Sequence, residues 1–387
     1  MPTPHHAAGL RCAAVVLVVL SAASCSDEPA PARPTTTSGT SAPGTPSALP
    51  SPRVTRTRMA LEEPQTPLAT PRAADLPPSR LFAPDNVYRV DLTKAPVEPR
   101  SPAMVKHLIG QITPNWNGVA GFNTDQYNTS YYVVDDKTPR QDVAFYDCQG
   151  KKEVPWGVED GPAMWKQVPV PAGAQPAHGT DKAMSIYDRS TDQLWEFWIM
   201  EPVTRGGRTG WRACWGGRID RVSSAPGYYD QGFGVPASGL THVGTMITLD
   251  EARRGLIEHA IGLVLIETGD ASRVWYPANR SDGVSTHPDA IPEGARLRLD
   301  PAVDVDSLPL SPMGKVIARA AQRYGFLVVD TSGAVAVIGQ SGQGEQARTG
   351  KDPWKQILGG TMPYDVLKGF PWERMQVVRR DYGKPVG

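Results

Sequence analysis

The stretch AHGTDKAMSIYDRSTDQLWEFWIM, residues 177–200, decides how we interpret the rest of the chain. Two alternating apolar runs, 182–188 and 194–200, flank the five polar residues 189–193. A polar connection of this length between two such runs predicts a β-hairpin. Large apolar side chains occupy both faces of the second run, so we expect a central strand pair that is covered on both sides.

Glu196 is the exception within this hairpin. It lies between Leu194 and Trp198 on one face of the expected strand. A buried carboxylate has to be paired, protonated or open to a cleft. One interpretation makes Glu196 a general acid or nucleophile whose pKa is raised by burial. The other makes it the structural partner of an arginine such as Arg212, and the sequence leaves both open.

The N-terminus has the features of an export signal. Arg11 precedes a short apolar run, 13–20, and the small residues 21–24 follow it. This run is too short to span a bilayer. Cys25 comes directly after the small residues, as in the lipobox of bacterial lipoproteins. The resemblance implies a lipid on Cys25 and anchoring on the extracellular face of the cell membrane. An ordinary signal peptide with a chance cysteine is the alternative.

Composition divides the rest of the chain into a tether and a domain. Residues 25–80 are rich in Pro, Thr, Ser and Ala, which predicts an extended, disordered tether. Residues 81–387 have globular composition and form the expected single domain. The whole chain carries 40 Lys and Arg against 40 Asp and Glu, so no basic surface argues for nucleic acid.

Cysteine usage predicts a disulfide. Cys12 would leave with the signal and Cys25 would carry lipid, which leaves Cys148 and Cys214 to pair outside the cytoplasm. The sequence has no CxxC motif, no phosphate loop and no Cys/His cluster with zinc-ligand spacing. We therefore expect neither a metal nor a cofactor, and we expect a monomer.

The domain has about ten apparent short strands and two short helices. The helices follow the capping box Thr248–Glu251 and the Ser311-Pro312 pair. A long strand is expected within 256–268, and a second hairpin within 326–338. Without βαβ alternation, this pattern predicts an all-β fold, an antiparallel two-sheet sandwich of jelly-roll type. A β-propeller is the second possibility, although no blade repeat is visible.

From Leu81 to about Ile338 the chain resembles an uncharacterised family of secreted bacterial lipoproteins. The landmarks that carry the resemblance are FAPDN at 82–86, the 178–181 stretch leading into LWE at 194–196, SGL at 238–240, ITLDE at 247–251, GLIEHA at 255–260, WYPA at 275–278, GARLR at 294–298 and the unit 317–330. The resemblance implies a single secreted domain and a loose similarity to jelly-roll glycan-active proteins. It supplies no catalytic residue.

Aromatic residues beside glycine-rich loops are candidates for sugar binding. Trp215, Tyr228 and Tyr229 are candidates for substrate stacking, and Asp282 for polar contact with a substrate. The competing interpretation places tryptophans in the core, and we prefer it for Trp195.

The catalytic candidates are His178, Asp181, Glu196, His259 and Arg280. Each has a structural alternative: His178 and Asp181 as turn residues, His259 as a core histidine with one satisfied hydrogen bond, and Arg280 as a solvated surface residue. Because loops at one end of a sandwich cluster, we expect the segment before Lys182, the loop 222–240 and the Arg280 turn to converge.

These residue types favour a cell-surface lipoprotein that binds and cleaves a polysaccharide, as a glycoside hydrolase or a polysaccharide lyase. A non-catalytic module that binds cell-wall glycan is the alternative, as is a structural envelope lipoprotein.

Overall fold

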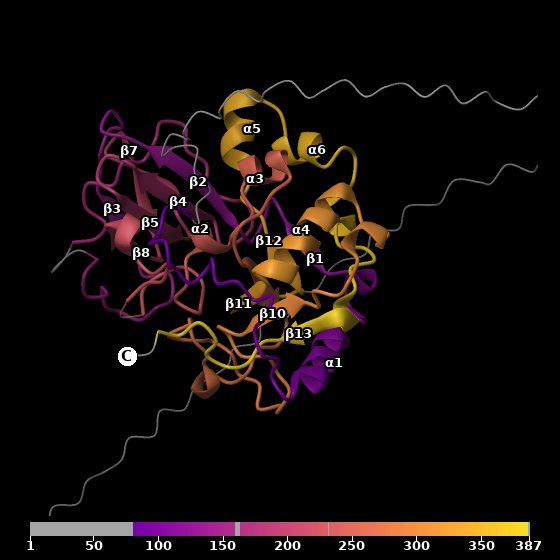
Figure 1. Ribbon diagram of the computed structural model, residues 1–387. Helices are drawn as coiled ribbons and strands as arrows, with labels where there is room; N and C mark the ends of the chain where they lie inside the picture. Colours follow the sequence, from indigo (N-terminus) through magenta and orange to yellow (C-terminus); the bar gives the residue numbers. More distant parts are fainter. Residues whose placement is uncertain (1–79, 159–162, 231, 386–387) are drawn as a thin grey trace, which may run out of the picture. The chain divides into compact units, whose positions relative to one another are not determined.

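The computed structural model of the protein describes residues 80–158, 163–230 and 232–385. Within these ranges the chain forms 13 strands in three sheets and six α-helices (Figure 1). Each sheet contains a parallel strand pair, so the fold is mixed α/β. The predicted all-β antiparallel jelly-roll sandwich is wrong. The predicted signal peptide, Cys25 and the tether lie outside the described residues, apart from Arg80.

The predicted hairpin of residues 182–200 forms as β4 (Ala183–Asp188) and β5 (Gln193–Trp198), paired antiparallel. It lies in a four-stranded sheet with the order β2-β4-β5-β8. β8 (Trp215–Asp220) pairs antiparallel with β5, whereas β2 (Thr129–Val134) pairs parallel with β4. The hairpin is therefore interior to its sheet, as its composition predicts.

A six-stranded sheet with the order β1-β12-β9-β11-β10-β13 forms the second layer. Its strands are β1 (Gly121–Asn123), β9 (Ile261–Leu265), β10 (Arg296–Leu299), β11 (Phe326–Thr331), β12 (Ala336–Ile338) and β13 (Met375–Val377). β9 lies between β11 and β12, pairing parallel with the first and antiparallel with the second. The second predicted hairpin, within 326–338, is therefore wrong.

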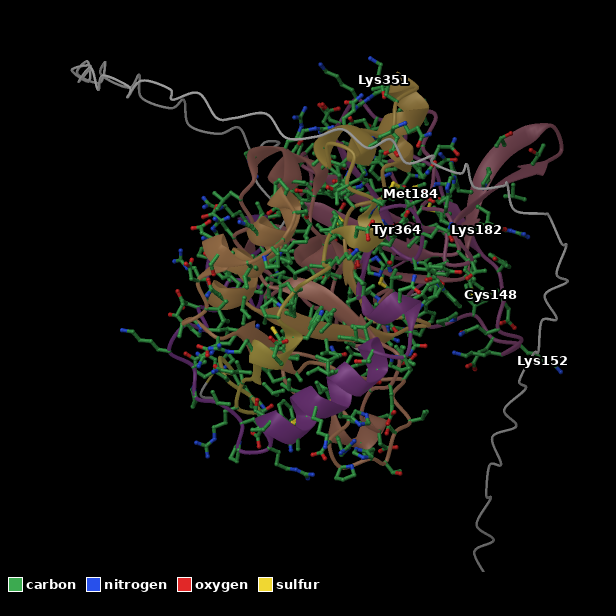
Figure 2. All side chains as sticks on the ribbon, turned by 90° about the vertical axis from the view of Figure 1, so that its right-hand side faces the viewer. Cys148, Lys152, Lys182, Met184, Lys351 and Tyr364 are labelled. Atoms are coloured by element: carbon green, nitrogen blue, oxygen red, sulfur yellow. A yellow bond between two sulfur atoms is a disulfide. The ribbon has the colours of Figure 1, made fainter. Side chains whose placement is uncertain are left out.

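The third sheet is small and carries the disulfide. β3 (Val143–Phe145) pairs parallel with β7 (Arg208–Ala213), which pairs antiparallel with β6 (Glu201–Arg205). Cys214 follows β7 directly and is bonded to Cys148, with their Cα atoms 5.6 Å apart. Cys148 is labelled in Figure 2 beside the loop that carries Lys152. The predicted disulfide is thus present.

Six α-helices accompany the sheets: α1 (Ser101–Ile112), α2 (His242–Thr245), α3 (Leu249–Arg254), α4 (Pro312–Arg323), α5 (Gln343–Thr349) and α6 (Pro353–Ile357). α1 lies beside β13 (Figure 1), and α4 packs against β10. The predicted Thr248–Glu251 capping box begins α3, and Ser311 caps α4.

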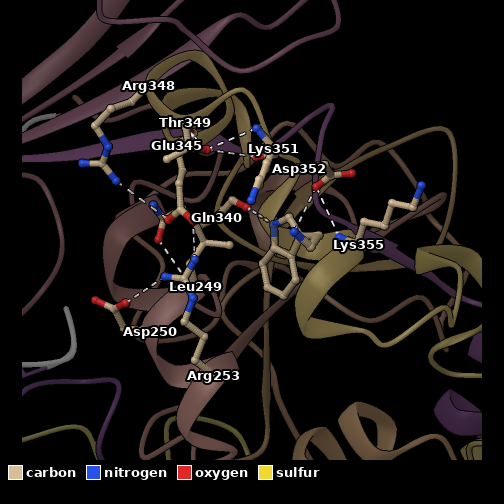
Figure 3. A network of polar contacts seen from close by, with 11 residues as sticks. Leu249, Asp250, Arg253, Gln340, Glu345, Arg348, Thr349, Lys351, Asp352 and Lys355 are labelled. Atoms are coloured by element: carbon tan, nitrogen blue, oxygen red, sulfur yellow. Dashed lines mark hydrogen bonds and ion pairs between the residues drawn. The ribbon is translucent and has the colours of Figure 1, made fainter.

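A network of polar contacts joins three of these helices, with Gln340 accepting from the Leu249 backbone N–H of α3 (Figure 3). Arg253 of α3 pairs with Asp250 and with Glu345 of α5. Trp354 of α6 donates its indole N–H to the Gln340 carbonyl at 2.8 Å. Helices this short are only marginally stable on their own, so these contacts help to hold them in place.

Side-chain alternation in the sheets produces three cores. Leu263 of β9 packs with Ile317 of α4 on one face of the six-stranded sheet. The next residue, Val264, packs on the other face with Leu194 of the four-stranded sheet. Trp195, on the opposite face of β5, belongs to a third core toward the small sheet. Both faces of the central strands are covered, which is why they form continuous apolar runs in the sequence.

The expected long strand at 256–268 is also shorter than its composition indicates. Only Ile261–Leu265 forms β9, and His259 precedes it. Among the described residues, no helix is both long and apolar enough to cross a membrane.

Candidate functional site

A cleft of about 1550 Å³ is lined by residues from the four-stranded and the six-stranded sheets. Trp198 of β5, Trp215 of β8 and Val264 of β9 are among the strand residues in its wall. Such a volume exceeds the range of about 300–1,000 Å³ that is common for small-molecule pockets. The cleft has room for an extended ligand. Four residues named from the sequence line it: Asp181, Trp215, Arg280 and Asp282.

Exposed aromatic side chains gather at this cleft. The described residues include four aromatic side chains with large exposure, and three of them line the cleft. These are Trp116 at 69 % exposure, Tyr127 at 48 % and Tyr364 at 62 %; Tyr364 is labelled in Figure 2. The fourth, Trp156, is 58 % exposed and lies outside the lining. Contact between an apolar ring and water is unfavourable. The gathering of exposed rings in one cleft therefore indicates a ligand-binding surface.

Asp181 and Trp215 occupy the wall formed by the four-stranded sheet. The Trp198 indole N–H donates to Asp181 Oδ1 at 3.0 Å and so orients the carboxylate. The Trp215 ring stacks on Phe233 at a centroid distance of 5.6 Å, and the Lys151 ammonium lies 5.8 Å from the Trp215 ring centroid. Since the disulfide joins Cys148 to Cys214, it ties the Lys151 loop to this wall.

Three carboxyl groups form a cluster beside Arg280. Asp282, Glu293 and Asp330 each offer an oxygen, and these atoms lie within 4.8 Å of one another. Asp282 and Asp330 line the cleft, while Glu293 lies beneath them and is 0 % exposed. We call these three residues the carboxyl cluster.

Local backbone structure fixes two members of the carboxyl cluster, Asp330 and Glu293. A register shift in β11 between Val328 and Asp330 turns the Asp330 side chain out of simple alternation. Glu293 precedes Gly294, which has φ +83° and whose Cβ, if present, would lie 1.7 Å from the Trp275 carbonyl oxygen. Only glycine fits there, so the chain is held closely at Glu293.

Asp282 and Asp330 also receive hydrogen bonds that orient them. The Thr331 hydroxyl donates to both oxygens of Asp282 at 2.9 Å. The backbone N–H groups of Ala237 and Thr331 donate to Asp330 at 3.1 and 3.0 Å. Glu293 is different, because neither of its oxygens has a hydrogen-bond partner of acceptable geometry among the described residues.

Burial and mutual repulsion raise the pKa values of this cluster. Burial raises the pKa of Glu293 to about 10, and Asp282 and Asp330 add to the shift. Burial likewise raises the pKa of Asp330 to about 7, with a further contribution from the charge of Asp282. Asp330 is partly accessible at the cleft surface but is otherwise surrounded by protein atoms.

The three carboxyl groups act electrostatically on Arg280. Burial lowers its pKa, while Asp330, Glu293 and Asp282 oppose that shift. Its Nη2 donates to the carbonyls of Gly234 and Pro236, each at 2.9 Å. These bonds hold the loop 222–240 against the Arg280 turn. Among the described residues, Arg280 makes no ion pair within 4.0 Å.

His242 lines the cleft on another side. It begins α2, and its backbone N–H and that of Val243 donate to the Glu196 carboxylate at 3.1 and 2.9 Å. Burial lowers the pKa of His242 to about 4, so its imidazole is neutral at neutral pH. Its Nδ1 has no hydrogen-bond partner among the described residues. Depending on the tautomer, this nitrogen can donate a hydrogen bond to a ligand in the cleft or accept one from it.

The other sequence candidates lie away from the cleft lining. Glu196 is 0 % exposed beneath α2, and burial raises its pKa to about 7. Tyr229 is 1 % exposed, and Tyr228 contacts Tyr276 edge to face. His259 is 0 % exposed and pairs with Glu251 at 3.2 Å.

His178 is at the border of the cleft. Its Nδ1 lies 2.9 Å from an oxygen of Asp125, which is a lining residue. His178 and Arg280 therefore lie near the same cleft although they are distant in sequence. Asp181, Arg280 and part of the 222–240 loop all line this cleft. We expected them to converge because of a jelly-roll sandwich, and that reason is wrong.

Sequence reasoning missed His242, Glu293 and Asp330. Asp330 and Glu293 each occur beside a glycine-containing turn, where a carboxylate commonly bonds a backbone amide. One signal was available for Asp330, because it lies at the turn of the hairpin that we expected within 326–338, and side chains at strand ends often form sites. His242 carries no comparable signal.

No family model matches this chain, and neither the curated proteins nor the solved structures include a significant match.

Proposed function

We propose that the protein binds a polysaccharide chain in the cleft and cleaves it. The observation that carries this proposal is the gathering of Trp116, Tyr127 and Tyr364 at a cleft that also contains acid and base groups. Flat aromatic faces stack on sugar rings, and the cleft has room for several of them. Because the sandwich prediction is wrong, the resemblance to jelly-roll glycan-active proteins lends this proposal no support.

Cleavage of a glycosidic bond needs groups that move protons and groups that stabilise negative charge. His242 offers a neutral imidazole whose unpartnered Nδ1 can form a hydrogen bond with a sugar hydroxyl. Asp181 offers a carboxylate oriented by Trp198. Arg280 offers a cation beside the same cleft, suited to a sugar carboxylate or a developing oxyanion. These groups serve hydrolysis or elimination.

The test is incubation of the protein with a panel of neutral and uronate-containing polysaccharides. New reducing ends without a chromophore indicate hydrolysis, and ultraviolet absorbance from unsaturated uronates indicates elimination. Binding without either product would make the protein a glycan-binding module. If no polysaccharide binds, the proposal is wrong.

Matched aromatic variants locate the binding surface. Trp116→Ala and Tyr364→Ala remove exposed cleft rings, and Trp156→Ala removes an exposed ring elsewhere. We expect each cleft variant to weaken glycan binding roughly tenfold, which corresponds to about 1.4 kcal/mol of stacking. Trp156→Ala should bind like the unchanged protein. Equal effects in all three variants would place the glycan elsewhere.

We also propose that the protein is exported and lipid-anchored through Cys25. The support is the order of apolar run, small residues, cysteine and Pro/Thr/Ser-rich segment. Cys25→Ala should move the protein from the membrane fraction into the culture medium. Recovery of the unchanged protein from the medium without lipid would contradict the anchor.

A further inference from the structure

The carboxyl cluster has a feature that the proposed glycan chemistry does not use. Glu293 is completely buried, yet neither carboxyl oxygen has a hydrogen-bond partner of acceptable geometry among the described residues. Ser281 and Asp282 approach it closely enough to affect its pKa. A buried polar group left unpartnered destabilises the folded state, and an unpaired charge does so more strongly. The fold keeps this carboxyl group nevertheless.

Buried carboxylates elsewhere in the protein are treated differently. Glu196 accepts two backbone N–H groups, and Glu251 accepts from Thr248 and pairs with His259. Both are therefore supplied with donors by the fold. Glu293 instead points an oxygen at the oxygens of Asp282 and Asp330, within 4.8 Å. Glu293 thus faces two other carboxyl groups without a donor of its own, an arrangement that requires a positive ligand or protons.

The charge balance of the cluster fits a divalent ion. Three carboxylates beside the cation Arg280 leave a surplus of two negative charges when all are ionised. Arg280 directs its Nη2 at the backbone carbonyls of Gly234 and Pro236. The Arg280 guanidinium therefore does not form an ion pair with the cluster and offsets its negative charge only at a distance. Without a bound cation, the same surplus has to be removed by protons.

We propose that Asp282, Glu293 and Asp330 together bind one hard divalent cation, Ca²⁺ or Mg²⁺. All the offered ligand atoms are carboxylate oxygens, and oxygen ligands suit these ions, whereas zinc sites are built mainly from histidine and cysteine. Glu293 forms the closed base of the site, and the exposed Asp282 and partly exposed Asp330 open onto the cleft. Water or a ligand in the cleft completes the coordination.

The bonds around the cluster support this role. Thr331 holds both oxygens of Asp282, and the N–H groups of Ala237 and Thr331 hold Asp330. Outer hydrogen bonds of this kind orient metal ligands. The inference does not rest on the proposed glycan function, because cation binding is measured without any glycan.

The experiment is isothermal titration of the full chain, stripped with a chelator and dialysed, with CaCl₂, MgCl₂ and ZnCl₂ in separate runs. We expect one Ca²⁺ or Mg²⁺ per chain. Glu293→Gln and the exposed Asp282→Asn should each weaken binding roughly tenfold or more, since even outer partners of metal ligands have effects of that size. Asp365→Asn removes a cleft carboxylate outside the cluster and should leave the affinity unchanged.

Three outcomes overturn the proposal. They are the absence of binding to the unchanged protein, binding of Zn²⁺ alone, and binding that Asp365→Asn weakens as much as Glu293→Gln. Thermal unfolding of each variant in chelator shows that it is folded. Asp282 is exposed, so Asp282→Asn keeps the test decisive if Glu293→Gln fails to fold.

Discussion

Glu251 and Glu293 are both buried carboxyl groups, with 1 % and 0 % exposure, but their surroundings are opposite. Glu251 accepts the Thr248 N–H and hydroxyl at 3.1 and 2.8 Å, and an oxygen lies 3.2 Å from His259 Nε2. Glu293 has two other carboxyl groups as neighbours and no hydrogen-bond partner of acceptable geometry among the described residues.

The pKa values record this difference. Burial acts to raise the pKa of Glu251, yet the charge and hydrogen bond of His259 and the two hydrogen bonds from Thr248 together outweigh it, and the pKa is lowered. Burial acts to lower the pKa of His259, and Glu251 outweighs it in turn. For Glu293, burial and the neighbouring carboxyl groups act in the same direction, so its pKa rises to about 10.

The two surroundings separate buried charges that belong to the fold from those that belong to the cleft. A carboxylate that receives hydrogen bonds and an ion-pair partner from the fold stabilises the elements that supply them, here α3 and the approach to β9. A carboxylate without partners lowers stability, and the protein keeps it at the base of a cleft. Strongly perturbed groups in clefts are candidates for function for this reason.

The largest expected effect comes from breaking the Glu251–His259 pair. His259→Leu leaves the Glu251 charge buried without its cation, so the free energy of unfolding should fall by about 3–5 kcal/mol. Urea unfolding monitored by tryptophan fluorescence measures it. As a control, Glu251→Leu combined with His259→Leu should recover part of the loss, because an apolar pair carries no desolvation penalty. A single variant that loses under about 1 kcal/mol would show that the pair is not structural.

The substitution Glu293→Gln should stabilise the protein, whereas His259→Leu destabilises it. In chelator at pH 7 the folded protein keeps Glu293 protonated, whereas the unfolded chain ionises it near pH 4.5. The glutamine side chain resembles the neutral acid and removes this cost, which is about 3 kcal/mol. The free energy of unfolding should therefore rise. A loss of stability in Glu293→Gln would mean that the ionised group has a partner that we have not identified.

The pH dependence separates the two groups further. Glu293 has a folded pKa raised above its unfolded value, so its contribution is intact below about pH 4.5 and is lost as pH rises toward 10. The difference between Glu293→Gln and the unchanged protein should grow by about 1.4 kcal/mol per pH unit in that window. Asp330, with a pKa of about 7, is present in both proteins, so its own titration largely cancels in this difference. A difference that does not change with pH would contradict the raised pKa.

The Glu251–His259 pair should respond at both ends of the pH range instead. Its stabilisation is lost in acid as pH falls through the lowered pKa of Glu251. It is lost in alkali as pH rises through the raised pKa of His259. The loss in free energy of unfolding caused by His259→Leu should therefore be largest at pH values between these two pKa values.

The elements set by local patterns could be predicted from the sequence. The 183–198 hairpin depends on two apolar runs and a polar turn, and α3 depends on the Thr248–Glu251 capping box. Their causes lie within a few residues of each other. The order of the strands has no such local cause. β9 separates β11 from β12, and β1 pairs with β12 from more than 200 residues away.

The site likewise contains residues that could be predicted from the sequence and residues that could not. Asp181, Arg280 and Trp215 could be named because their residue types and loop positions suit sugar chemistry. Asp282 could also be named, but its grouping with Glu293 and Asp330 could not, because each of those two alone resembles a turn residue. Only the packing of three distant segments brings Asp282, Glu293 and Asp330 within 4.8 Å.

The smallest expected effect belongs to a third pair, His178–Asp125, which tests whether pairing or burial decides the cost of a lost partner. The two side chains lie 2.9 Å apart but are 58 % and 47 % exposed. Water solvates both side chains, so the pair should contribute less than about 0.5 kcal/mol. His178→Ala should therefore change the free energy of unfolding by no more than this, at low salt and at high salt alike. If His178→Ala instead costs over about 2 kcal/mol, well above the range for exposed pairs, close pairing alone would be enough to make an ion pair structural. The different effects of Glu251 and Glu293 on stability would then depend on whether each group has a partner, and burial would contribute little.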